Sequence, residues 1–218
     1  PRAFSEPETQ IFRELVTKFE PTAFVTVHSG TRGMYMPWAY DKENLATRNQ
    51  VQMMKLLRDL DKSHCQCPYG AAGKEVGYSC PGTSLDWVYD KLQTPYSFAF
   101  EIYTSPASDR ELQARWTSKV ESGGLNLLQS GQNLGHPHFL DLFQTHVSDF
   151  VQTRDHGAGR RKRARRHIHN ERSRVREDDA QCFGEFNPDT EERYEATVDN
   201  WAAVYMEMSH KIAQNLRT

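Results

Sequence analysis

Apolar residues recur at two spacings near the start of the chain, and each spacing predicts a different element. Over residues 11–19 they lie three or four positions apart, which is the period of an amphipathic helix. Ser5 and Glu8 precede this stretch at the spacing of a capping box, and Glu20-Pro21 is expected to end the helix. Residues 22–27 are mostly apolar, β-branched or aromatic, so they predict a short buried strand.

The same alternation is repeated further along the chain. Residues 43–60 have helical spacing of apolar positions, and residues 96–100 form a second short apolar run that predicts a strand. Helices and strands in alternation favour an α/β layer fold with largely parallel strands. His28 and Glu101 would then lie just past two strand ends, which is where ligands bind in open α/β sheets.

Composition and charge narrow the class of protein. The chain has 218 residues, of which 37% are hydrophobic, enough for one globular domain with a core. No apolar run is long enough to predict a membrane span. Residues 159–177 hold nine Lys or Arg residues against two Glu residues, although the net charge of the chain is −2. One basic segment on an acidic body does not favour nucleic-acid binding, for which positive charge is spread along a face.

The basic segment belongs to a longer stretch, residues 105–181, in which the pattern changes. Its glycines punctuate two helical patterns, and its arginine run fits a nuclear-import signal, a nucleic-acid patch, a processing site or a solvated, disordered loop. Cys65 and Cys67 lack the two-residue spacer of common zinc knuckles, so we interpret them as structural or free. Residues 182–218 end in a final predicted helix.

Four segments stand in an order and at spacings that match one enzyme family. They are Pro1-Arg2-Ala3-Phe4-Ser5-Glu6-Pro7-Glu8-Thr9, Ala23-Phe24-Val25-Thr26-Val27-His28-Ser29-Gly30 followed by Met34-Tyr35-Met36-Pro37-Trp38-Ala39-Tyr40, Tyr78-Ser79-Cys80-Pro81-Gly82-Thr83-Ser84-Leu85-Asp86-Trp87, and Tyr96-Ser97-Phe98-Ala99-Phe100-Glu101. Phe186-Asn187-Pro188 and the helix of Trp201 resemble the closing segment of the same family. Together they resemble the C-terminal portion of zinc carboxypeptidases of the carboxypeptidase A type, peptidase family M14. The resemblance implies a three-layer α/β/α fold around a central mixed, mostly parallel sheet.

The resemblance implies roles for five residues. His28 would bind zinc through a neutral imidazole nitrogen, and Ser29 beside it would contact the substrate. Glu101 would take a proton from the attacking water and return it to the leaving amine. Tyr78 would close over the C-terminal residue of the substrate. Leu85 would lie at the base of the specificity pocket, where an apolar side chain favours aromatic or large aliphatic ends over Lys or Arg.

The chain also departs from the family pattern. The first two zinc ligands of the family come from a His-x-x-Glu, and this sequence contains none. We therefore expect the remaining zinc ligands upstream of residue 1, a fold incomplete at its N-terminus, and no activity from residues 1–218 alone. The start of the chain, without Met or signal sequence, indicates the middle of a protein.

The domain organisation follows from these matches. Residues 1–104 would be the C-terminal half of the catalytic domain, residues 105–181 an insertion with a basic, disordered run, and residues 182–218 the closing segment. Substrates would be peptide or protein C-termini, and family habit implies secretion; the oligomeric state stays open. The alternative is a non-catalytic, carboxypeptidase-like binding module whose insertion binds a partner or a polyanion.

Overall fold

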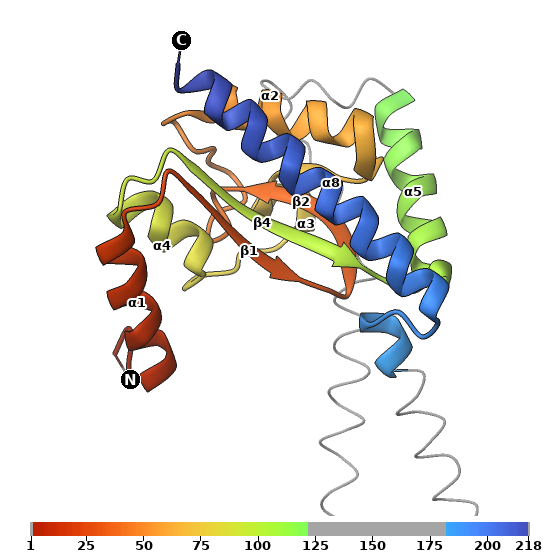
Figure 1. The fold of residues 1–218 in the computed structure, drawn as a ribbon, viewed down its shortest axis with the longest axis horizontal. Helices are drawn as coiled ribbons and strands as arrows, with labels where there is room; N and C mark the ends of the chain where they lie inside the picture. The colour runs from red at the N-terminus through yellow and green to blue at the C-terminus, as the bar shows by residue number, and fades with distance from the viewer. Residues whose placement is uncertain (1, 122–181, 218) are drawn as a thin grey trace, which may run out of the picture. The chain divides into compact units, whose positions relative to one another are not determined.

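A four-stranded sheet organises the computed structural model, which describes residues 2–121 and 182–217. Its strands are β1 (Ala23–His28), β2 (Thr31–Met36), β3 (Tyr69–Ala71) and β4 (Tyr96–Tyr103), in the spatial order β1-β4-β2-β3. β1 is parallel to β4 and β2 is parallel to β3, whereas β2 and β4 are antiparallel. The sheet is therefore mixed, and its central strand β4 was among the expected ones (Figure 1).

One face of the sheet is covered by a large apolar core. It packs against helices α2 (Gln50–Leu60), α5 (Pro106–Glu121) and α8 (Glu191–Asn215), and α2 and α8 lie side by side (Figure 1). β4 contributes Phe98 and Phe100 to this core, both fully buried, because alternate side chains of a strand point to the same face. Burial of such side chains supplies most of the driving force for folding.

The opposite face carries three other helices and a smaller core. These are α1 (Pro7–Phe19), α3 (Ala72–Val76) and α4 (Ser84–Lys91). α1 has no fully buried residue and touches the sheet through Phe12, whose ring centroid lies 5.8 Å from that of Phe24. Helices therefore flank both faces of the sheet, which confirms the expected three-layer α/β/α class.

Two predicted helix starts are wrong, for local reasons. α1 begins at Pro7 without a side-chain cap, because the Ser5 hydroxyl donates to Glu6 Oε1 at 2.9 Å instead of capping the helix. Proline at the first helical position needs no N–H partner, so it starts the helix by itself. The second helix begins at Gln50 rather than residue 43, because the Asp41 carboxylate accepts backbone N–H bonds from the residues that follow it and forms a turn.

The second predicted strand is longer than expected. β4 continues to Tyr103, so Glu101 lies within the strand, not past its end, while His28 is the last residue of β1. β2 and β3 were not predicted at all. The second of the two helical patterns expected within residues 105–181, with apolar positions at Phe139, Phe143 and Val147, lies outside the described residues, as does the basic segment. None of the described helices is long and apolar enough to cross a membrane.

The structure describes all four cysteines, of which two form a disulfide and two are free thiols. Cys65 and Cys67 form a disulfide and are both buried in the large core, which fits the structural interpretation. Cys80 is free and half-buried, and Cys182 is free and exposed. The two free thiols therefore differ in their surroundings.

Candidate active site

The parallel pairing of β1 and β4 brings His28 and Glu101 together. The two are direct partners in the register of these strands, so their side chains start from adjacent points of the sheet. Glu101 follows Phe100, which points into the large core, and therefore lies on the other face with Ala99. The expected place just past a strand end is thus approached by His28, the last residue of β1, but not by Glu101, which lies within β4, and the roles of both residues stay predictions.

Glu101 is a carboxylate with an incomplete set of hydrogen bonds. Its Oε2 atom is buried and has no hydrogen-bond partner among the described residues. Burial raises the pKa of Glu101 from 4.5 to about 7, because the charged form loses its hydration. A carboxyl group with a pKa near neutrality can both accept and return a proton under physiological conditions.

His28 and Ser29 are more open to solvent than Glu101. Both are exposed, and the His28 Nε2 atom lies 3.0 Å from the Thr26 hydroxyl on the same face of β1. That contact orients the imidazole ring. No described contact explains Ser29, so its substrate-binding role stays a prediction.

Tyr35 is a site residue that the sequence reasoning missed. It points to the same face as Glu101, since Tyr35 pairs with Ala99 and Gly33 pairs with Glu101 across β2 and β4. Its ring lies over Gly33, where a Cβ atom would overlap the Tyr35 hydroxyl. Burial raises the pKa of Tyr35, and the charge of Glu101 adds to the rise. A neutral phenol therefore lies close to the catalytic candidate.

Tyr78 lies in the loop between α3 and α4, as expected, and is half-buried. Burial raises its pKa to about 12, and the charges of Cys80 and Glu101 and a hydrogen bond to Cys80 add to the rise. The charge of Glu101 thus acts on the Tyr78 phenol, and Cys80, two residues further along the loop, packs against the smaller core with Ala99 on the face that carries Glu101. The structure thus brings His28, Glu101 and Tyr78 to one region.

Leu85 is buried in the protein, whereas a side chain at the base of an open pocket would be accessible to solvent. Only 1% of its surface is exposed, and it packs with Tyr35, Ala39 and Ala72 in the smaller core. Its backbone oxygen accepts a hydrogen bond from the Ser97 hydroxyl at 2.9 Å. Its predicted role in specificity is untested by this packing.

The described residues do not complete a zinc site. Nowhere in residues 2–121 and 182–217 do three His, Cys, Asp or Glu side chains gather in a way that could hold a metal ion. A catalytic zinc in a hydrolase has three protein ligands and one open position. His28 alone does not fit that requirement.

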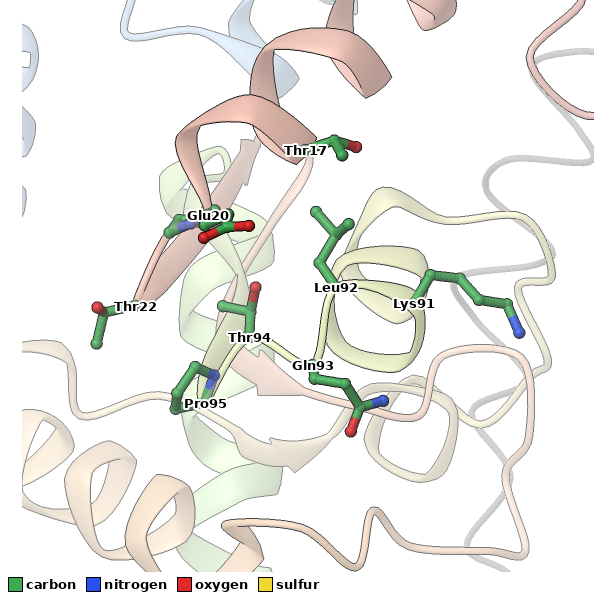
Figure 2. A pocket seen from close by; sticks show the side chains of 9 residues that line it. Thr17, Glu20, Thr22, Lys91, Leu92, Gln93, Thr94 and Pro95 are labelled. Carbon is green, nitrogen blue, oxygen red and sulfur yellow. The ribbon is translucent and has the colours of Figure 1, made fainter.

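The hollow in Figure 2 is not the candidate site. It measures about 450 Å³ and lies where α1 and α4 end and β1 and β4 begin, so it is at the opposite strand ends from Glu101. Glu20, Lys91 and Thr94 are among the side chains that line it. None of His28, Tyr78 and Glu101 is among the residues that line it.

The family of the protein is decided by the first 122 residues. Residues 1–122 match the zinc carboxypeptidase family, peptidase M14. The chain belongs to this family. The match includes all three segments that carry His28, Tyr78 and Glu101, which the structure gathers in one region.

Individual relatives of this carboxypeptidase chain match over shorter stretches. Carboxypeptidase B2 of Bos taurus is 26% identical over 103 residues, which is 45% of this chain and 24% of that protein. The chain therefore spans about a quarter of the length of that relative. The relatives found do not support a specific assignment to the A type, because the curated one is a carboxypeptidase B2.

Two solved structures are similar at low identity. The crystal structure of thrombin activatable fibrinolysis inhibitor has a TM-score of 0.41 and 19% identity, over 56% of this chain and 36% of that one. Bovine thrombin-activatable fibrinolysis inhibitor in complex with tick carboxypeptidase inhibitor has a TM-score of 0.40 and 23% identity, over 55% of this chain and 46% of that one.

Proposed function

We propose that this chain supplies the proton-transfer part of a metallocarboxypeptidase site that hydrolyses the C-terminal peptide bond of peptides or proteins. The observation that carries the proposal is the half-buried Glu101 side chain, whose Oε2 atom is buried without a hydrogen-bond partner among the described residues and whose pKa is raised by burial to about 7. An unpaired buried carboxylate costs folding free energy, so its retention favours a chemical role.

The surrounding residues divide the work around Glu101. Glu101 accepts the proton of the attacking water and passes it to the leaving amine. The Tyr78 phenol, held neutral close by, donates a hydrogen bond to the bound substrate. His28 presents a nitrogen donor at the adjacent strand end. The further donors that a zinc ion needs come from outside the described residues.

The test replaces Glu101 by glutamine in the full-length protein that contains this chain. The amide cannot accept the proton, so peptide hydrolysis should fall by about 10²- to 10⁴-fold while the metal content stays the same. Glu20→Gln, at the opposite end of β1, is the matched control and should keep full activity. If Glu101→Gln still binds peptide C-termini and wild-type protein also shows no turnover, the non-catalytic binding module replaces this proposal.

Metal binding by the isolated chain tests the source of the other ligands. Residues 1–218 alone, dialysed against zinc, should retain much less than one zinc ion per chain, because one histidine gives little affinity. Stoichiometric zinc measured by atomic absorption would place the missing ligands within residues 122–181. Neither result tests the role of Glu101, which the Glu101→Gln substitution tests separately.

We further propose that the enzyme prefers apolar or aromatic C-terminal residues, since Leu85 presents no charge to a basic side chain. Full-length protein should hydrolyse peptides ending in Phe or Leu faster than those ending in Lys or Arg, and Leu85→Asp should reverse that order. Faster cleavage of basic ends by the wild type would overturn this. The Cys65–Cys67 disulfide supports secretion, because disulfides persist in oxidising compartments.

A further inference from the structure

We propose, resting on the function above, that Phe186 is a positioning residue that fixes the connection between β1 and β2. This connection consists of Ser29, the predicted substrate contact, and Gly30, and it follows His28 directly. Phe186 lies in the closing segment of the chain, far from these residues in sequence. Its ring packs against Gly30, and it acts on the site through that contact.

The connection between β1 and β2 has little slack. β4 lies between these two strands in the sheet, so residues 29–30 must cross the end of β4. Neighbouring strands lie about 4.8 Å apart, so the crossing covers about 10 Å, and three residue steps of extended chain reach about 10–11 Å. A displacement of Gly30 is therefore passed on to Ser29 and to the end of β1.

Gly30 is held on three sides. Its N–H donates to the Tyr103 oxygen at 2.8 Å, and its own oxygen accepts from the Thr104 hydroxyl at 3.2 Å. The Phe186 ring lies on the third side, where a Cβ atom at position 30 would be only 2.6 Å from Phe186 Cε1. Gly30 has a φ angle of 119°, which glycine adopts without strain. Position 30 thus needs glycine both for its backbone and for the close approach of the ring.

The residue before Phe186 anchors the ring to the end of β4. The Glu185 Oε1 atom lies 3.0 Å from the Thr104 hydroxyl, whose single hydrogen is therefore shared between this carboxylate and the Gly30 oxygen. Burial acts to raise the pKa of Glu185, but hydrogen bonds to its charged form outweigh burial and lower it. The ionised carboxylate is a strong acceptor, so it ties the closing segment to the residue that also holds Gly30.

Hydrogen exchange tests the contact without any enzyme assay. In the full-length protein, Phe186→Ala should speed exchange of the Gly30 N–H about three- to tenfold, because the crossing opens more often without the ring. Phe186→Tyr keeps the ring and should retain the wild-type rate. Exchange is followed by mass spectrometry of peptides that cover residues 28–31.

The opposite end of the same strand pair supplies the internal control. The Tyr96 N–H donates to the Thr22 oxygen at 3.2 Å, and its exchange should be the same in Phe186→Ala and wild type. An unchanged rate at Gly30 would overturn the proposal. An equal increase at Gly30 and Tyr96 would also overturn it, since the ring would then contribute only to overall stability.

A double variant tests the contact from the side of Gly30. Gly30→Ala places a Cβ atom against the ring and should lower the thermal midpoint of unfolding. Phe186→Ala removes the ring, so the double variant should unfold at a higher temperature than the two separate shifts predict together. Gly33→Ala, whose Cβ atom meets Tyr35 instead, is the matched control and should combine additively with Phe186→Ala. Additive shifts for the Gly30 pair would overturn the proposal.

Kinetics connect the contact to the proposed function. In the full-length protein, Phe186→Ala should raise KM for peptides about three- to tenfold and change kcat less than about twofold, because the predicted substrate contact at Ser29 loses its fixed position. Phe186→Tyr should keep the wild-type KM. An unchanged KM in Phe186→Ala would overturn the positioning role. A raised KM with unchanged exchange at Gly30 would overturn it too, since the ring would then contact the substrate directly.

The experiments separate this proposal from the proposed function. Turnover by Glu101→Gln at the wild-type rate would reject the function of the site, yet hydrogen exchange and the double variant would still report the contact at Gly30. If Glu101→Gln is inactive and exchange at Gly30 is unaffected by Phe186→Ala, the catalytic role stands and Phe186 has no positioning role.

Discussion

The two faces of the sheet are built on different principles. The face covered by α2, α5 and α8 is a continuous apolar core that includes Phe98, Phe100 and Trp201. The face covered by α1, α3 and α4 has a small core, and the polar groups Glu101 and Tyr78 lie beside it. Both faces are lined by the same strand, β4, because its side chains alternate.

This contrast indicates that the side chains of β4 on one face of the sheet contribute mainly to stability, whereas those on the other face contribute mainly to the chemistry of the site. Substitutions on the first face should cost folding free energy. Those on the second face should alter proton affinity, the position of Tyr35 and turnover, at a smaller cost in stability. Four substitutions test the separation, from the largest expected effect to the smallest.

Phe98→Ala should lower the free energy of unfolding by about 3–5 kcal/mol, because it removes a fully buried ring and leaves a cavity. Phe24→Ala, on the opposite face in β1, is the matched control and should cost less, since Phe24 is only half-buried. Urea unfolding followed by circular dichroism measures both. Equal losses would show that the two faces contribute alike and would break the comparison.

Glu101→Gln should change how stability depends on pH. Because burial raises the pKa of Glu101 from 4.5 to about 7, the folded state holds the proton more tightly than the unfolded chain. Wild-type stability should therefore decrease as the pH rises from about 4.5 to 7, by up to about 3 kcal/mol in total.

The glutamine variant lacks this decrease, so above pH 7 it should be the more stable protein. Urea unfolding at pH 4.5 and pH 8 compares the two. A parallel pH dependence in both proteins would contradict the raised pKa.

Gly33→Ala should disturb the site more than the core. The added Cβ atom overlaps the Tyr35 hydroxyl, so the ring must leave its place over Gly33, which pairs with Glu101 across β2 and β4. Overpacking of this kind costs about 1–3 kcal/mol, and turnover of the full-length protein should fall as well. Crystal structures of both proteins would locate the ring. An unmoved ring with normal activity would count against a role for Tyr35.

Thr83→Ala should have the smallest of the four effects, a loss of about 0.5–2 kcal/mol. The Thr83 side chain accepts a hydrogen bond from the Asp86 N–H and caps α4, whereas Ser5 makes no such bond at the start of α1. Ser5→Ala is therefore the control, with almost no expected change. Thermal unfolding of the two variants distinguishes a real cap from a sequence pattern that resembles one.

Much of the architecture was predictable from local pattern. The runs that became β1 and β4 are short, apolar and β-branched or aromatic, and the final helix has a clear apolar stripe. The family resemblance pointed to His28, Tyr78 and Glu101 because each lies in a segment whose sequence matches the family. The boundaries failed where a side chain competes with helical hydrogen bonds, as Asp41 does before α2.

The remaining features depend on contacts between distant segments. β2 was missed because Arg32 and Gly33 interrupt its apolar run, and its partner β4 lies more than sixty residues away in sequence. Without β2 there was no way to see that Gly33 stands opposite Glu101 and leaves room for Tyr35. Pairing in a sheet is non-local, and single-sequence periodicity does not encode it.

β1 ends the sheet on one side and carries His28 at its last residue. In the part of the chain that the structure describes, β1 pairs only with β4, so its outer backbone groups from residue 23 to residue 28 offer a template for another strand. Any strand added there in parallel would finish beside His28. If that strand carried further metal ligands, its pairing with β1 and the binding of a metal ion at His28 would be thermodynamically linked. Stronger strand pairing would then raise the metal affinity, and metal binding would in turn stabilise the pairing.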